Sequence, residues 1–216
     1  MPGLSTFETE TRETLIFSTV DLSSMIKPRA AIRIAAGDHV YRAGAEGLAW
    51  RLHTGVVRLD TTGPDGRAAF ASLAIAGDIL GCETMLFGAY TFSATASTEC
   101  RLLPWPEGVS ALAGDTLLAT LVQAQQRAAD IVALRGGQAI DRVVGLIRLL
   151  ADSAGRVVLP PRRDIADITD LRAETISRVI KGLERTGVLA SVRIEGVDAH
   201  RSYSVDPPAL NGFTAA

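Results

Sequence analysis

Residues 29–104 show short hydrophobic runs interrupted by polar turns, the pattern of a β-rich region. Runs of about five residues rich in Val, Ile, Leu and Ala are separated by glycine-containing turns every 8–12 positions. Gly63-Pro64-Asp65-Gly66 suits the tip of a hairpin, because Pro presets one turn dihedral and Gly accepts a positive φ. We find no helical period in this region. The pattern therefore predicts an all-β barrel or jelly roll.

A helical period begins after Pro104-Trp105-Pro106. Asp115 can cap a helix in which apolar or small residues recur every three or four positions, namely Leu117, Leu121, Ala124, Ala128 and Ile131. Such a stripe can pack on the chain's own barrel. Its alanines favour the close approach of a second helix, so we interpret it as a contact between two copies of the chain. Gly136-Gly137 then predicts an interdomain hinge, because each glycine costs about 1 kcal/mol inside a helix.

The residues after this hinge predict a second, smaller domain. Apolar positions at helical spacing run from Ile140 to Ala151, and a short strand follows at Val157–Leu159. Residues 164–187 then predict two helices joined by a tight connection at Asp170-Leu171. Residues 189–194 and 201–205 predict a hairpin beside them. This order is typical of a winged helix-turn-helix.

The second helix of this pair carries the candidate functional residues. Glu174 and Arg178 lie four positions apart, on the face opposite the apolar residues, in the helix half that enters a DNA major groove. A carboxylate can accept from cytosine N4, and a guanidinium can donate to guanine O6 and N7. The alternative is an exposed ion pair without function. The predicted DNA-binding residues are Arg172, Glu174, Thr175, Ser177, Arg178 and Lys181.

The net charge of the whole chain does not indicate DNA binding, but the charges of its two parts differ. The net charge of the 216 residues is −2, which is not typical of a nucleic-acid-binding protein. Residues 138–216 hold 11 Lys and Arg against 10 Asp and Glu, whereas residues 1–137 hold 11 against 14. The sign of this difference fits a C-terminal DNA-binding module. No run approaches the roughly 18 apolar residues of a membrane helix, and the N-terminal stretch is acidic, so we expect a cytoplasmic protein that does not contact membranes.

Other residue types argue against an enzyme. The three histidines, His39, His53 and His200, form no metal-ligand spacing, and we find no Gly-rich phosphate loop, nucleophile elbow or paired catalytic carboxylates. Cys82 and Cys100 are too few for a disulfide framework and lie outside metal-binding spacing. We therefore expect no metal and no cofactor. A cupin-like enzyme stays as a remote alternative.

The chain resembles the CRP/FNR family of bacterial regulators over about residues 30–205. The phrases GDHVYRAG, HTGVVRL and AGDILG resemble the family's sensor domain, and DIADITDLRAETISRVIKGLERTGVL resembles its winged helix-turn-helix. The resemblance implies an α+β fold: a cyclic-nucleotide-binding-like β-barrel (jelly roll) over residues 1–110, a dimerisation helix and hinge over 111–137, and a winged helix-turn-helix over 138–216. It also implies a homodimeric transcription regulator that binds promoter DNA and acts on RNA polymerase.

Within the family, the form ETISR, with Glu174, Ser177 and Arg178, resembles the FNR/FixK-type branch. That resemblance implies a TTGAT-type half-site repeated as an inverted palindrome. Two positions depart from the family pattern. Asp170 stands where the turn usually has Gly, and Arg172 stands where the helix usually has a Ser or Thr cap, which forfeits about 1 kcal/mol of capping.

The resemblance also bears on what the barrel senses. Cyclic-nucleotide binders of the family carry Gly-Glu and then Arg-Ser about ten residues later, whereas this chain has Gly81-Cys82 and Phe92-Ser93. Without the arginine a buried cyclic phosphate has no cation, which is costly, so we expect no response to cyclic AMP. The N-terminal cysteine cluster for oxygen sensing is absent, since the first cysteine is Cys82. A small-molecule effector at the Gly81–Ser93 loop, or a redox role of Cys82, stays open.

Overall fold

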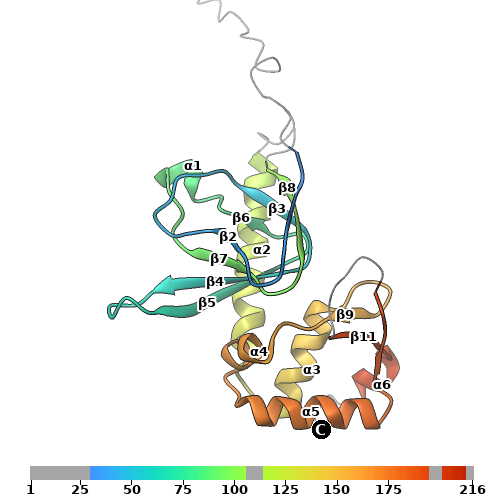
Figure 1. The fold of residues 1–216 in the computed structure, drawn as a ribbon. Helices are drawn as coiled ribbons and strands as arrows, with labels where there is room; N and C mark the ends of the chain where they lie inside the picture. The colour runs from blue at the N-terminus through green and yellow to red at the C-terminus, as the bar shows by residue number, and fades with distance from the viewer. Residues whose placement is uncertain (1–29, 106–113, 195–200, 213–216) are drawn as a thin grey trace, which may run out of the picture.

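The computed structural model describes residues 30–105, 114–194 and 201–212. They form a β-region (residues 30–105) and a C-terminal region (residues 139–212 without 195–200), joined by the long helix α2, Gly114–Ala133 (Figure 1). In Figure 1 the β-region lies above the C-terminal region, and α2 runs alongside the β-region down to the junction. The residues with a strand-like pattern and those with a helical pattern thus form separate regions of the structure.

Two antiparallel sheets of four strands make the β-region. One has the order β1-β8-β3-β6 and the other β2-β7-β4-β5. The strands are β1 Ile32–Ile34, β2 His39–Tyr41, β3 Trp50–Thr54, β4 Val56–Thr62, β5 Ala68–Ile75, β6 Ile79–Leu80, β7 Ser93–Ala96 and β8 Cys100–Pro104. The alternation of apolar residues places Leu52, Val57, Ala94 and Leu102 in the core.

The β-region contains the hairpin tip predicted at residues 63–66, and it also contains one short helix that we do not predict. The amide of Gly63 donates to the carbonyl of Arg67 at 2.8 Å, and Gly66 has a φ of 76°, so the predicted tip closes the β4–β5 hairpin. The structure also contains α1, Thr84–Phe87, where we predict no helix. That expectation is wrong because a single helical turn is too short to show a period.

The C-terminal region follows the predicted order of elements and ends in one further short helix, Pro207–Asn211 (α6), that we do not predict. Its helices are α3 Ala139–Leu150, α4 Arg162–Thr169, α5 Ala173–Arg185 and α6 Pro207–Asn211. Its strands β9 Arg156–Val158, β10 Leu189–Ser191 and β11 Ser202–Val205 form an antiparallel sheet of order β10-β11-β9. The predicted break between the first two long helices is present, and Gly137 adopts a φ of 75° there.

Helix α2 divides its apolar residues between two sides. Ile131 is buried and belongs to the same hydrophobic cluster as residues of α3, α4 and α5. Arg127 donates to both carboxylate oxygens of Asp78, at 3.0 and 3.3 Å, and so ties the helix to the β5–β6 turn. Our assignment of Ile131 to a surface for a second copy is therefore wrong. Ala124 and Ala128 of the predicted stripe are exposed, and the large apolar side chains exposed on the described part of this helix are Leu118, Leu121, Val122 and Val132.

A buried cluster of charged groups joins the β-region to α4. The Arg58 guanidinium, on β4, lies 2.7 Å from a carboxylate oxygen of Asp60 and 3.4 Å from one of Asp164, and it also contacts Asp167. The Ser97 hydroxyl donates to the second oxygen of Asp164 at 2.6 Å. Because Arg58 and Asp164 are both buried, little solvent screens their attraction.

We expect Arg58→Ala to lower the free energy of unfolding by about 3 kcal/mol, because it leaves the Asp164 carboxylate buried without its cation. Urea denaturation followed by circular dichroism measures the change. Arg67→Ala is the control, since Arg67 pairs with Asp65 in solvent and its loss should cost less than about 1 kcal/mol. Equal losses for the two variants would show that the cluster adds no stability.

Candidate DNA-binding surface and sensor site

Helix α5 has one apolar, buried face and one polar face. Ile176, Ile180 and Leu183 are buried at helical spacing and pack on the C-terminal core, which includes α3 and α4. Figure 1 shows α5 along the end of the molecule farthest from the β-region. Its other side therefore faces away from the rest of the chain.

The six predicted DNA-binding residues all belong to that polar side or to its edge. Arg172, Glu174, Arg178 and Lys181 are exposed, and Thr175 and Ser177 are half-buried. No side chain of the six forms a hydrogen bond or ion pair with the part of the chain that the structure describes. The Glu174–Arg178 ion pair that we considered as an alternative is thus not present. The polar groups are available to an external partner, and their contact with DNA stays a prediction.

The turn before α5 places its first residues. Asp170 has φ 53° and ψ 46°, and it alone among the described non-glycine residues has a positive φ. The amide of Leu171 donates to the carbonyl of Ala166 at 3.2 Å, which closes the turn. Arg172 precedes α5 in an extended conformation, and its side chain makes no capping hydrogen bond. The first departure from the family pattern is accommodated because Asp tolerates the left-handed region, whereas the second leaves the α5 N-terminus without a side-chain cap.

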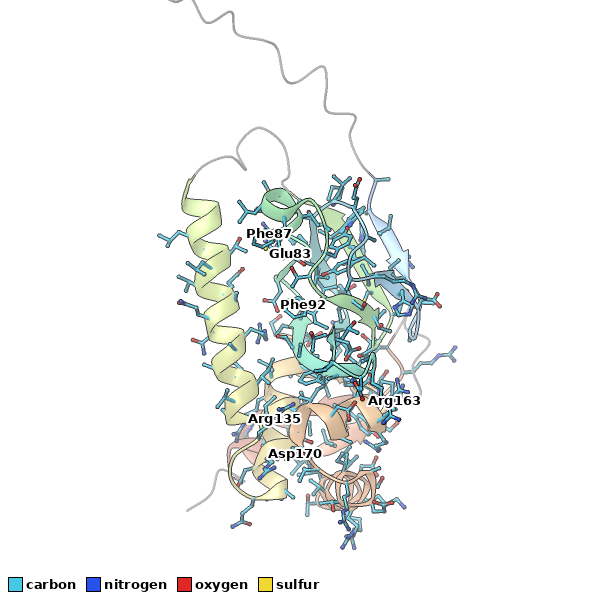
Figure 2. The ribbon with its side chains drawn as sticks, turned by 90° about the vertical axis from the view of Figure 1, so that its left-hand side faces the viewer. Glu83, Phe87, Phe92, Arg135, Arg163 and Asp170 are labelled. Atoms are coloured by element: carbon cyan, nitrogen blue, oxygen red, sulfur yellow. The ribbon has the colours of Figure 1, made fainter. Side chains whose placement is uncertain are left out.

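Two arginines from outside α4 donate hydrogen bonds to the carbonyl groups at its C-terminal end. No pattern of neighbouring residues predicts these contacts. Arg135 donates to the carbonyls of Asp167 at 3.0 Å and Ile168 at 3.3 Å. Arg142 donates to the carbonyl of Thr169 at 3.1 Å. Cationic donors suit a helix C-terminus, where carbonyls lack intrahelical partners. Figure 2 labels Arg135 and Asp170 in the lower part of the molecule, below the β-region.

The Gly81–Ser93 loop packs a tyrosine side chain into the core of the β-region. Tyr90 is 6% exposed and stacks on Tyr41 with ring centres 3.7 Å apart. Its hydroxyl donates to the carbonyl of Leu48 at 2.8 Å and accepts from the Leu48 amide at 2.9 Å. A Cβ atom on Gly47 would lie 2.1 Å from that hydroxyl, so Gly47 is needed to admit the ring. Phe92, half-buried and labelled in Figure 2, follows on the same loop.

The surroundings of the two cysteines disfavour the thiolate form. Burial, followed by the charge of Glu83, raises the pKa of Cys82. Burial raises the pKa of Cys100 to about 11. Both groups are therefore protonated at neutral pH, whereas redox-sensing cysteines depend on a thiolate. Over the described ranges we also find no group of three or more His, Cys, Asp or Glu able to hold a metal, and no helix long and apolar enough to cross a membrane.

Comparison with known proteins identifies the family. The family description "Cyclic nucleotide-binding domain" matches residues 31–109. The chain is 34% identical over 179 residues to the "Nitrogen fixation regulation protein FixK" of Bradyrhizobium diazoefficiens, covering 75% of this chain and 72% of that protein. The chain belongs to the CRP/FNR family. Within it the chain is similar to the FixK branch, and it is a transcription regulator rather than an enzyme.

Other relatives agree with this assignment. The chain is 28% identical over 188 residues to the "Transcriptional regulator LdrP" of Thermus thermophilus, covering 82% of this chain and 93% of LdrP. The crystal structure of TTHB099, a CRP-family regulator from Thermus thermophilus, has a TM-score of 0.61 at 27% identity and covers 84% of this chain and 95% of that one. FixK2 from Bradyrhizobium japonicum, with a TM-score of 0.63 at 24% identity over 87% of this chain and 98% of that one, shares the fold.

We expect Arg172→Ala to reduce the dependence of DNA binding on salt. If Arg172 contacts one phosphate, its removal should make the negative slope of log Kobs against log salt about 0.9 less steep and weaken binding similarly on all sequences. Fluorescence anisotropy across a salt series measures both quantities. Arg67→Ala, at the distant β4–β5 tip, is the control. If Arg172→Ala leaves affinity and slope unchanged, Arg172 makes no phosphate contact.

Proposed function

We propose that the chain acts as a homodimeric winged helix-turn-helix regulator that reads a palindromic TTGAT-like promoter site. In this proposal α4 and α5 form the helix-turn-helix, and β10 and β11 form the wing. The observation that carries it is the set of unengaged polar side chains on the exposed face of α5. Glu174 and Arg178 can read the two strands of the single G·C pair in each half-site, and Ser177 can hydrogen bond to a neighbouring base.

A homodimer is supported by the exposed apolar residues of α2. Leu118, Leu121 and Val122 are each more than half exposed, and Val132, one turn beyond Ala128, is 73% exposed. Large apolar side chains that repeat along one helix are the usual sign of a helix partner. A second α2 in parallel orientation covers them and brings two α5 helices to one face of the DNA. Half-sites about one turn apart then match the two-fold symmetry of the protein.

We further propose that the regulator acts without cyclic AMP. Phe92 stands where the family's phosphate-binding arginine is expected. A cyclic nucleotide bound at the Gly81–Ser93 loop would bury a charge without a counter-ion. The protein then works in the cytoplasm, on promoter DNA, by contacting or blocking RNA polymerase.

Selection of bound sites from random DNA with the purified protein tests the proposed base contacts of α5. We expect enrichment of an inverted repeat of TTGAT-like half-sites. Arg178→Ala should relax the preference at the G·C pair by about 1–3 kcal/mol, because it loses the bidentate contact to guanine. Lys181→Ala is the matched control and should weaken all sites alike. Enrichment of an unrelated sequence, or of single half-sites, contradicts the proposed site or the dimer.

Isothermal titration calorimetry tests the proposed independence from cyclic AMP. We expect no saturable heat with cyclic AMP up to about 1 mM, the range in which even weak specific sites with binding free energies near −4 kcal/mol become detectable. Titration with 5′-AMP controls for unspecific nucleotide binding. One-to-one binding of cyclic AMP in the micromolar range, absent for 5′-AMP, shows that the loop holds a cyclic nucleotide after all.

A further inference from the structure

A cavity of about 540 Å³ lies between the two regions of the molecule, apart from the Gly81–Ser93 loop. One wall comes from β1, β8 and the turns at the ends of β3 and β5, and the other from the end of α3 and from β9. Its volume is within the range of about 300–1,000 Å³ typical of small-molecule sites.

The wall on the β-region has an excess of positive charge. Arg33 on β1 and Arg101 on β8 stand directly opposite each other across the two strands, and both line the cavity. Like charges in this register repel each other. Glu99 lies 3.7 Å from Arg33, but Arg101 forms no ion pair with any residue in the described part of the chain. Among the described residues, Arg101 therefore presents a guanidinium without an ion-pair partner to the cavity.

The opposite wall adds apolar surface without adding free negative charge. Leu149 and Leu150, at the end of α3, are half-buried and line the cavity together with Val56 and Ile75 of the β-region. The one carboxylate of this wall, Asp152, is held by Arg156 at 2.9 Å. Both carboxylates that line the cavity thus have an arginine partner. As far as its described lining goes, the cavity combines an apolar surface with one arginine that has no ion-pair partner.

We propose that this cavity binds a small amphipathic anion, an apolar body bearing one carboxylate or similar anionic group. Arg101 donates to the anionic group, and Leu149 and Leu150 cover the apolar body. Because the walls belong to the β-region and to the region that carries α5, one bound molecule contacts both. The proposal does not rest on DNA binding, since the site is complete within a single chain.

Calorimetry with 2-naphthoate, in the absence of DNA, tests the site. The full-length protein should bind one 2-naphthoate per chain with a Kd of about 100 µM or tighter. The uncharged amide 2-naphthamide, which has nearly the same shape, should bind at least about tenfold more weakly, because it cannot form the charged contact. Absence of saturable 2-naphthoate binding, or equal binding of the amide, overturns the proposal.

Substitutions locate the bound anion. Arg101→Gln should weaken 2-naphthoate binding at least about tenfold and leave 2-naphthamide unchanged, whereas Arg101→Lys should retain most of the affinity. Circular dichroism verifies that both variants fold. Arg67→Gln, a change of another exposed arginine, should have no effect. If Arg101→Gln binds 2-naphthoate as the unsubstituted protein does, the anion binds elsewhere and the proposal is wrong. DNA binding can succeed or fail independently of this result.

Discussion

The position of α4, and through it of α5, depends on one buried guanidinium. Arg58 belongs to the β-region, yet two of its three carboxylate partners, Asp164 and Asp167, lie on α4. A buried ion pair is a weak source of net stability compared with apolar packing, but it is strict about geometry. Any shift of α4 along the β-region separates the charges in a medium that screens them poorly. The cluster therefore fixes the position of α4 on the β-region more than it adds to the free energy of unfolding.

Around this cluster, α4 is held both by the β-region and by the link between α2 and α3. Phe70 of β5 lies under both Arg58 and Arg135, with the guanidinium carbons 5.5 and 5.4 Å from the ring centre. Arg135 also donates to the carbonyls at the end of α4, and it directly precedes the glycines that separate α2 from α3. The two glycines of the link are thus bordered by a side chain that hydrogen-bonds to the end of α4. The orientation of α5 is held from the β-region and from the link at once.

The features predicted from sequence are those encoded by neighbouring residues. The period of Ile176, Ile180 and Leu183 defines the buried face of α5, and Asp170 marks the turn, because both signals are local. The Arg58–Asp164 contact spans 106 positions, and nothing near either residue indicates the other. Ile131 continues an exposed period and is nevertheless buried, since α3 to α5 fold back against the end of α2. The ring of Tyr90 fits only because Gly47 and Gly81 lack side chains, a condition visible only in three dimensions.

Tyr90 has a consequence for which changes the β-region tolerates. Its ring stacks on Tyr41 of β2, and its hydroxyl binds both backbone groups of Leu48, so one side chain joins three segments of the β-region. Because a Cβ atom on Gly47 or Gly81 would overlap the ring, these three positions can change only together. A substitution at one of them alone leaves a void or a steric overlap in the core.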